Sequence, residues 1–262
     1  MEGLMAKMGY DEIKALLEEK SALYNQPAFI ETDPIQIPKQ FTRKENIEIA
    51  AFLAATLAWG QRPTIVKNAT KLMSFMDWAP LEFLIHSTEK DLAVFDGFKH
   101  RTFNGEDGRF FIRSLKNIYR NHGGLEPVFN SGYNKDGKIK SALSNFHKVF
   151  FETKGLQRSR KHVSNVGTGS AAKRLNMFLR WMVRHDKNGV DFGLWKEIPM
   201  GSLMLPLDVH TGNISRKLGI LTRKQNDWKA VEEVTSILRE FDSGDPVKYD
   251  FALFGLGAFE KF

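Results

Sequence analysis

The chain has 262 residues, a formal net charge of +7 and no cysteine. The absence of thiols excludes disulfides, thiolate catalysis and cysteine-ligated clusters. The positive charge favours a polyanionic partner without identifying one. No apolar run reaches the length of a membrane span, and residues 1–20 lack the apolar core of a secretory signal. We therefore expect a cytoplasmic globular protein, folded as one large domain or two small ones.

The N-terminal quarter predicts helices separated by a proline-rich connector. Apolar residues share one face over 11–24, and three prolines within 25–44 predict an extended path. Residues 45–59 contain almost no polar side chain, which is typical of a helix buried on all sides. A turn at 60–63 ends this helix, and another helix is expected over 64–76.

The rest of the chain alternates helical segments with turns. Helices are expected over 81–87, 89–95, 110–121, 125–129, 139–151, 170–184, 227–241 and 249–259, the last interrupted by its two glycines. Asparagine, aspartate and glycine mark turns over 102–109 and 130–138. No segment of convincing length has the period of a strand, so the sequence predicts an all-α fold.

One stretch, 205–219, has a clear beginning and end. Pro206 disfavours helix at the residue before it, and Asp208 is a good N-cap because its carboxylate can accept from the free N–H groups of the first turn. Gly219 fits the position that follows a helix. These residues predict a short capped helix.

The same stretch resembles the Val-Asp-Thr-His-Val-x-Arg-Val-x-x-Arg-Leu-Gly signature of the helix-hairpin-helix DNA glycosylases. Six residues match it in order, identically or conservatively: Asp208, His210, Ile214, Lys217, Leu218 and Gly219. Asn213 stands where that family usually has Arg, and Val209 replaces Thr. The resemblance implies that Asp208 caps its helix and also works in catalysis, and it places His210 among the DNA-binding residues.

Two shorter segments resemble other parts of these glycosylases. A Gly-x-Gly turn before a helix exposes N–H groups to an anion, and residues 164–170 resemble the Leu-Pro-Gly-Val-Gly hairpin that holds a DNA phosphate, without its Leu-Pro. This implies DNA contacts for Gly167, Gly169 and Ser170. The segment 54–63 resembles the turn whose Gln enters the space left by an extruded base, which implies that role for Gln61; the alternative is a solvated turn residue.

The helix expected over 170–184 places Lys173, Arg180 and Arg184 on one face. This face is either a basic solvent surface or a track for phosphates. Bifunctional glycosylases use a Lys on this helix to attack the sugar C1′. Alignment on the second glycine places Ala171 there, whereas a Lys-x-x-x-x-Phe-Leu-Arg pattern, which resembles an archaeal 8-oxoguanine glycosylase branch, selects Lys173. We take Lys173 as the candidate nucleophile. The resemblance then requires an inserted segment between Lys173 and Asp208.

The resemblance covers roughly 45–257, and segments 170–184 and 206–210 are also similar to an uncharacterised bacterial family distantly related to the glycosylases. The resemblance implies two helical lobes, and the absence of cysteine excludes the iron–sulfur cluster that several of these glycosylases carry. Residues 44–184 would form the central lobe with the hairpin, 185–262 an inserted segment and the C-terminal lobe, and 1–43 a helix and connector packed on the latter.

The implied function is excision of a damaged or mispaired base from duplex DNA, by an N-glycosylase with or without lyase activity. The alternatives are a catalytically silent DNA- or RNA-binding protein on the same fold, and a helical interaction protein. We expect no cofactor, and the seven scattered histidines lack the spacing of a metal site.

Overall fold

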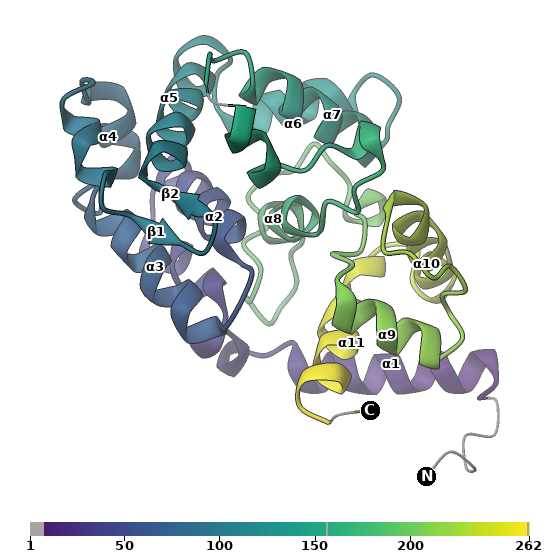
Figure 1. Ribbon diagram of the computed structural model, residues 1–262. Helices are drawn as coiled ribbons and strands as arrows, with labels where there is room; N and C mark the ends of the chain where they lie inside the picture. The colour runs from purple at the N-terminus through teal and green to yellow at the C-terminus, as the bar shows by residue number, and fades with distance from the viewer. Residues whose placement is uncertain (1–7, 156, 261) are drawn as a thin grey trace.

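A computed structural model describes residues 8–155, 157–260 and 262 of the chain (Figure 1). Helices dominate, and the described part contains a single sheet, a two-stranded hairpin. The predicted all-α class is confirmed. The α-helices are α1 (Tyr10–Tyr24), α2 (Lys44–Leu57), α3 (Arg62–Ser74), α4 (Pro80–His86), α5 (Gly105–Asn121), α6 (Leu125–Tyr133), α7 (Ile139–Phe150), α8 (Lys173–Val183), α9 (Val209–Lys217), α10 (Trp228–Phe241) and α11 (Tyr249–Ala258).

Short elements connect these helices. The hairpin consists of β1 (Lys99–His100) and β2 (Phe103–Asn104), which pair antiparallel. The 3₁₀ helices are η1 (Pro27–Thr32), η2 (Pro34–Gln36), η3 (Pro38–Gln40), η4 (Asp91–Phe95), η5 (Gln157–His162), η6 (Val166–Thr168), η7 (Met200–Ser202) and η8 (Pro246–Lys248).

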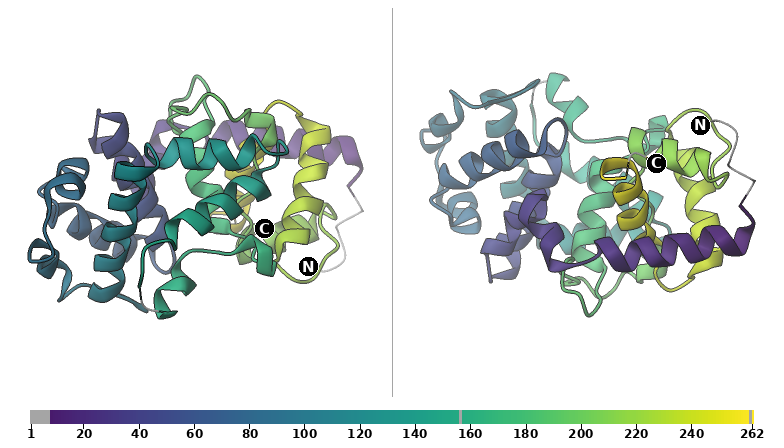
Figure 2. Two further views of the ribbon diagram at one scale, coloured as in Figure 1. Left: turned by 90° about the horizontal axis from the view of Figure 1, so that it is seen from above. Right: turned by 90° about the horizontal axis from the view of Figure 1, so that it is seen from below.

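The N-terminal helix α1 packs against α11, which also contacts α9 (Figure 2). The contact is close at Gly255, where a Cβ atom would lie 2.0 Å from Cδ2 of Tyr24. Only glycine leaves room for the tyrosine ring there. The expectation that glycines interrupt this helix is therefore wrong, because α11 continues through Ala258 and uses Gly255 for packing.

The proline-rich connector is not extended. Pro27, Pro34 and Pro38 each begin a 3₁₀ helix instead. Proline fits the first position of a helical turn, because its φ is already correct and its missing N–H has no partner to lose. The prediction of an extended path assumed that these prolines prevent helical turns, whereas each of them begins one.

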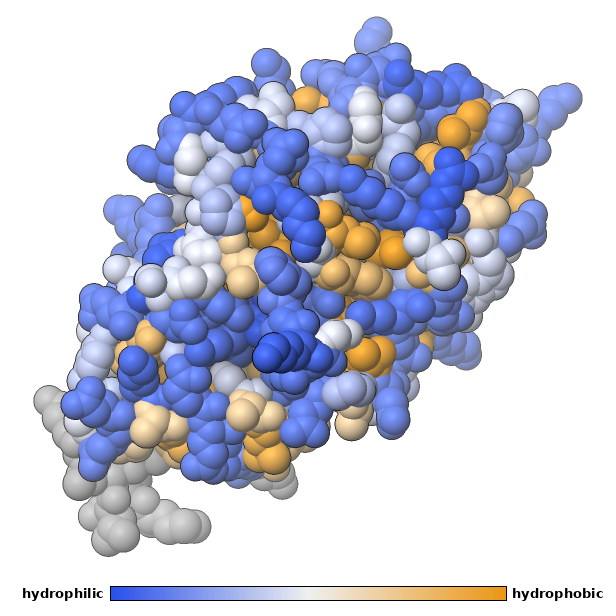
Figure 3. Space-filling model, turned by 180° about the vertical axis from the view of Figure 1, so that it is seen from behind, coloured by the Kyte–Doolittle hydropathy of each residue, from blue (hydrophilic) through white to orange (hydrophobic). Residues whose placement is uncertain are grey.

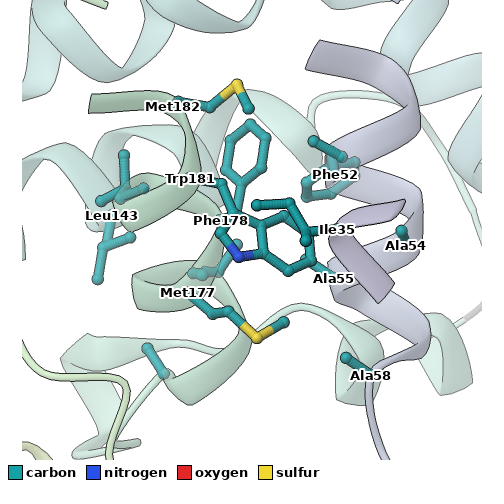
Figure 4. Packing of buried hydrophobic residues seen from close by; sticks show 14 of the residues in the cluster. Ile35, Phe52, Ala54, Ala55, Ala58, Leu143, Met177, Phe178, Trp181 and Met182 are labelled. Carbon is teal, nitrogen blue, oxygen red and sulfur yellow. The ribbon is translucent and has the colours of Figure 1, made fainter. Parts of the chain in front are cut away.

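The apolar helix α2 forms the middle of the core, as predicted. All its residues from Ile47 to Leu57 are buried. Its alanines allow α8 to approach closely, and Figure 4 shows Phe178 and Trp181 of α8 between this helix and Leu143 of α7. The aromatic rings of Phe52 and Phe178 meet edge to face, 5.8 Å apart. This packing fixes where the first turn of α8 lies.

Several helix boundaries differ from the predicted ones. Helix α5 begins five residues earlier than expected, because the Asn104 side chain accepts from the Asp107 N–H and Asp107 in turn accepts from the Asn104 N–H. Helix α6 continues to Tyr133. Helix α8 begins at Lys173 rather than Ser170, because Ala172 before it is left-handed, with φ of 49°.

The molecular surface is mostly polar. Figure 3 shows the face opposite to that of Figure 1, on which hydrophilic side chains predominate and apolar ones gather in a band near the middle. Among the described residues, no helix combines the length and the apolar character that crossing a membrane would require.

Candidate functional site

Asp208 caps helix α9 with only one of its two carboxylate oxygens. Its Oδ1 accepts from the backbone N–H groups of His210 (2.8 Å) and Thr211 (3.0 Å). The Thr211 hydroxyl accepts from the Asp208 N–H at 2.9 Å. Gly219 follows the helix with φ of 75°, a conformation that favours glycine. The predicted cap and stop are confirmed, and the cap leaves Oδ2 of Asp208 for other contacts.

Lys173 is the first residue of α8 and lies beside Asp208. Its Nζ is 3.9 Å from Asp208 Oδ2 and 3.8 Å from Sδ of Met177. Both charged side chains are 29% exposed, so the pair is neither fully buried nor fully solvated. The Lys173 side chain, which one of the two alternative alignments selects, thus lies beside Asp208. At the position that the other alignment selects, the Ala171 carbonyl accepts from the side-chain amide of Asn176.

The Lys173–Asp208 pair lines a cavity of about 550 Å³. Its walls come from the connector, the end of α2, and the helices α3, α8, α9 and α11. The volume lies within the range of small-molecule sites, which combine apolar walls with a few polar groups. The apolar side chains of the wall include Phe29, Trp59, Ile65, Met177, Phe251 and Phe254.

Asp33 is a second carboxylate of this cavity, and the sequence analysis missed it. Its Oδ1 accepts from the Ile35 N–H at 3.0 Å, and its Oδ2 lies 3.3 Å from Nη2 of Arg62. Burial raises the pKa of Asp33, while the Ile35 N–H and Arg62 act against this shift. An Asp directly before a proline reads as an N-cap, which explains why it attracted no functional interpretation.

Asp250 is a third carboxylate of the cavity, also missed. It is 7% exposed, and its Oδ2 accepts from the guanidinium of Arg180. Burial raises the pKa of Asp250 to about 6, although Arg180 and Lys173 favour its charged form. A lone Asp within the apolar run 249–254 was the available sequence signal, because a charge is seldom buried without a partner.

Arg180 and Arg184 do not form the basic surface predicted for α8. They are 3% and 2% exposed. Arg180 donates to Asp191 and Asp250, and Arg184 donates to Asp191, Asp186 and Asp245. Both predicted nucleic-acid contacts are therefore corrected: carboxylates from the inserted segment and from the C-terminal part of the chain occupy these guanidinium groups. The helical period placed the charges on one face correctly but could not show what covers that face.

The Gly-x-Gly turn is not the predicted anion cradle. The Gly167 N–H donates to the Asn165 side chain at 2.8 Å, the Gly169 N–H to the Val166 carbonyl at 3.1 Å, and the Ser170 N–H to the Asn165 carbonyl at 3.3 Å. These amides are satisfied within the turn. Helix α8 also starts beyond the turn, so its N-terminus does not reinforce anion binding there.

Gln61 and His210 lie near the mouth of the cavity. His210 is exposed and lines the cavity. Gln61 is exposed at the start of α3, between the cavity-lining residues Gly60 and Arg62, and does not itself line the cavity. Their predicted contacts with DNA stay predictions.

The site has acidic and basic groups but no arrangement of metal ligands. Within the described ranges, no three or more histidine, aspartate or glutamate side chains are grouped so that they could hold a metal ion. Lys173 and Asp208 offer the chemistry of an amine beside a carboxylate, in a partly apolar cavity.

Fold and site together define an all-α protein with an amine–carboxylate pair in a cavity between its helices. The chain belongs to the DUF2400 family, described as "Protein of unknown function (DUF2400)", whose profile matches residues 33–259. This match includes Lys173, Asp208 and the two buried carboxylates of the cavity. No curated protein and no solved structure matches the chain. The prediction of a family without assigned function is confirmed, and the resemblance to the glycosylases stays a prediction.

Proposed function

We propose that this protein is a base-excision enzyme that removes a damaged or mispaired base from duplex DNA, with Lys173 as nucleophile and Asp208 as its partner. The observation that carries the proposal is the 3.9 Å approach of Lys173 Nζ to Asp208 Oδ2 within the cavity. The two segments that resemble glycosylase motifs are distant in the chain, and their candidate catalytic residues meet.

The amine supplies the covalent step. Lys173 in its neutral form attacks the sugar C1′, a C1′–N bond to the lysine forms, and the glycosidic C1′–N bond breaks with its electron pair leaving on the base. One amine proton goes to the departing base. The C1′–O4′ bond then opens to give an imine, and the second amine proton goes to O4′. A lysine amine is a suitable nucleophile for such Schiff-base chemistry.

Asp208 supplies the electrostatic part of the reaction. Its Oδ1 is fixed by the first turn of α9, which holds Oδ2 toward Lys173. A carboxylate fixed in advance stabilises positive charge that develops on the sugar without having to reorganise. The ammonium proton of Lys173 goes to water before the attack, so that Asp208 keeps its negative charge.

The cavity wall is suited to a base that has left the DNA stack. An extruded base is held by stacking on aromatic or apolar side chains and by hydrogen bonds to its polar edge. Phe29 and Phe254 provide rings on one wall, and the Arg62 guanidinium lies 4.3 Å from the centre of the Phe254 ring. The carboxylates of Asp33 and Asp250, which also line the cavity, can accept hydrogen bonds from the polar edge of the base.

The test is incubation with a panel of lesion-bearing and mismatched duplexes, followed by borohydride. Borohydride reduces the imine and leaves a stable protein–DNA adduct, which we expect for the wild-type protein and not for Lys173→Gln. Lys148→Gln serves as the matched control, because Lys148 is an exposed lysine of α7 that does not line the cavity.

Two other results would change the assignment. Base release without an adduct would make the enzyme monofunctional and leave Asp208 as the catalytic group. Salt-dependent DNA binding without base release from any duplex would favour the silent DNA-binding alternative.

A further inference from the structure

The β1–β2 hairpin carries an arginine in an unusual backbone conformation. Lys99 pairs with Asn104 and His100 with Phe103, so that Arg101 and Thr102 form the turn. The φ of Arg101 is 54°, in the left-handed region that favours glycine. A side chain kept in this conformation is strained, and such strain is common where a residue has a function.

The hairpin is fixed on both sides of this arginine. The buried ring of His100 bonds Asn68 of α3 through Nδ1 (2.9 Å) and the Trp59 carbonyl through Nε2 (3.2 Å). The Thr102 carbonyl accepts from Nη2 of Arg158 at 3.0 Å. Figure 1 shows the hairpin beside α3 and α2, which agrees with these contacts. The turn is thus a rigid support rather than a loose loop.

Arg101 is directed at the wall of the cavity. Its guanidinium lies 5.0 Å from the centre of the Trp59 ring, and a Cβ added to Gly60 would be 3.0 Å from its Nη1. Trp59 and Gly60 both line the cavity. Arg101 itself is exposed, so it lies over the outer side of this wall.

The charge of Arg101 faces the aromatic ring of Trp59. Among the residues that the structure describes, no carboxylate lies within ion-pair distance of it. Arg62, which follows Trp59 and Gly60 at the start of α3, is paired with Asp33 at 3.3 Å. An unpaired guanidinium, held in place by a strained turn at the rim of a cavity, is suited to an anion that arrives with the substrate, because its planar fork matches a phosphate.

We propose that Arg101 contacts a backbone phosphate of the DNA strand whose nucleotide enters the cavity. This inference rests on the proposed function for the nature of the strand. The contact would hold the backbone beside the opening, with Trp59 beneath the guanidinium and Gly60 leaving it room. The net charge of +7 on the chain supplies a general attraction to DNA but does not select this position.

The test compares duplex binding at several salt concentrations for the wild-type protein, Arg101→Gln and Arg101→Gly. Loss of one phosphate contact should weaken binding to all sequences alike and lower the slope of log K against log salt by about 0.9. Arg101→Gly should also leave the unfolding midpoint unchanged or raise it, because glycine relieves the left-handed strain. If Arg101 only supported the hairpin, its substitution would instead lower the unfolding midpoint and leave the salt slope unchanged.

Controls separate this proposal from its alternatives. Lys148→Gln removes a charge of the same sign far from the hairpin in the chain and should change the slope less than the Arg101 variants. Inorganic phosphate, added at the same phosphate concentration as the duplex, should not displace it; displacement would mean a free-anion site and would overturn the strand contact.

The outcome also distinguishes this proposal from the proposed function. Equal salt slopes for Arg101→Gln and wild type, with adduct formation at Lys173 intact, would overturn the Arg101 contact alone. A lower slope without any base release or adduct would support the contact and overturn the enzyme. Wild-type protein that shows no salt-dependent binding would overturn both.

Discussion

The two ends of one face of α8 carry the same charge and meet opposite surroundings. At the first turn, Lys173 has a single carboxylate at 3.9 Å and remains partly exposed. Two and three turns later, Arg180 and Arg184 are buried and surrounded by carboxylates. The first end is left loosely paired, whereas the second is fully neutralised.

The difference separates the proposed reactive position from a structural one. A buried charge needs partners for all its hydrogen bonds, and removal of one partner leaves the others uncompensated. A half-exposed pair contributes little to stability, so its geometry is free to serve chemistry. The buried arginines fix α8 to the inserted segment and to α11, and this holds Lys173 against α9.

Arg184→Met should break the buried end and have the largest effect. It removes the partner of Asp191, Asp186 and Asp245 at once. We expect a loss of about 3–5 kcal/mol in the free energy of unfolding, measured by urea denaturation. Lys173→Gln at the other end should cost less than about 1 kcal/mol. Similar losses for the two variants would contradict the comparison.

Asp250→Asn should change how stability depends on pH. Folding raises the pKa of Asp250 from 3.8 to about 6, so the folded protein holds this proton more tightly than the unfolded chain does. The resulting stabilisation is complete below about pH 4 and is lost as the pH rises through about 6, a change of about 3 kcal/mol. Urea unfolding between pH 4 and 7 should therefore show the wild type losing stability relative to the variant.

Asp191→Asn is the control for this experiment. It also removes a carboxylate from Arg180 but keeps Asp250, so the loss of stability between pH 4 and 7 should persist. Parallel pH curves for wild type and Asp250→Asn would show that Asp250 does not titrate in this range.

Asp208→Asn should sharpen the distinction at the reactive end. Asn caps a helix about as well as Asp, so the free energy of unfolding should change by a fraction of about 1 kcal/mol. Under the proposed function, loss of the negative charge beside the sugar should lower base excision by about a hundredfold, while DNA affinity holds or rises. Excision is measured on whichever duplex the wild type cleaves.

Asp227→Asn provides the matched control for Asp208→Asn. Asp227 caps α10 by accepting from the Ala230 N–H at 3.1 Å and does not line the cavity. Its substitution should leave excision unchanged. Equal excision by wild type and Asp208→Asn would reduce Asp208 to a helix cap.

The sequence by itself determined the features that depend on neighbouring residues. The apolar run of α2 predicted its burial, and the order Pro206, Asp208 and Gly219 predicted a capped helix with the correct beginning and end. Helical period and capping are set within about one turn of the chain, so they can be read locally. Where local signals competed, the capping role of Asn104 prevailed over the turn interpretation, and the helix-starting role of the connector prolines prevailed over the expected extended path.

Only the tertiary structure decided what each charge faces. The helical period grouped Lys173, Arg180 and Arg184, but their partners lie outside the helix and include Asp208 and Asp250 from distant parts of the chain. The tertiary structure also decided that Lys173, rather than Ala171, reaches Asp208. The cost of burying a charge depends on partners brought together by the whole fold, and no local pattern in the chain contains that information.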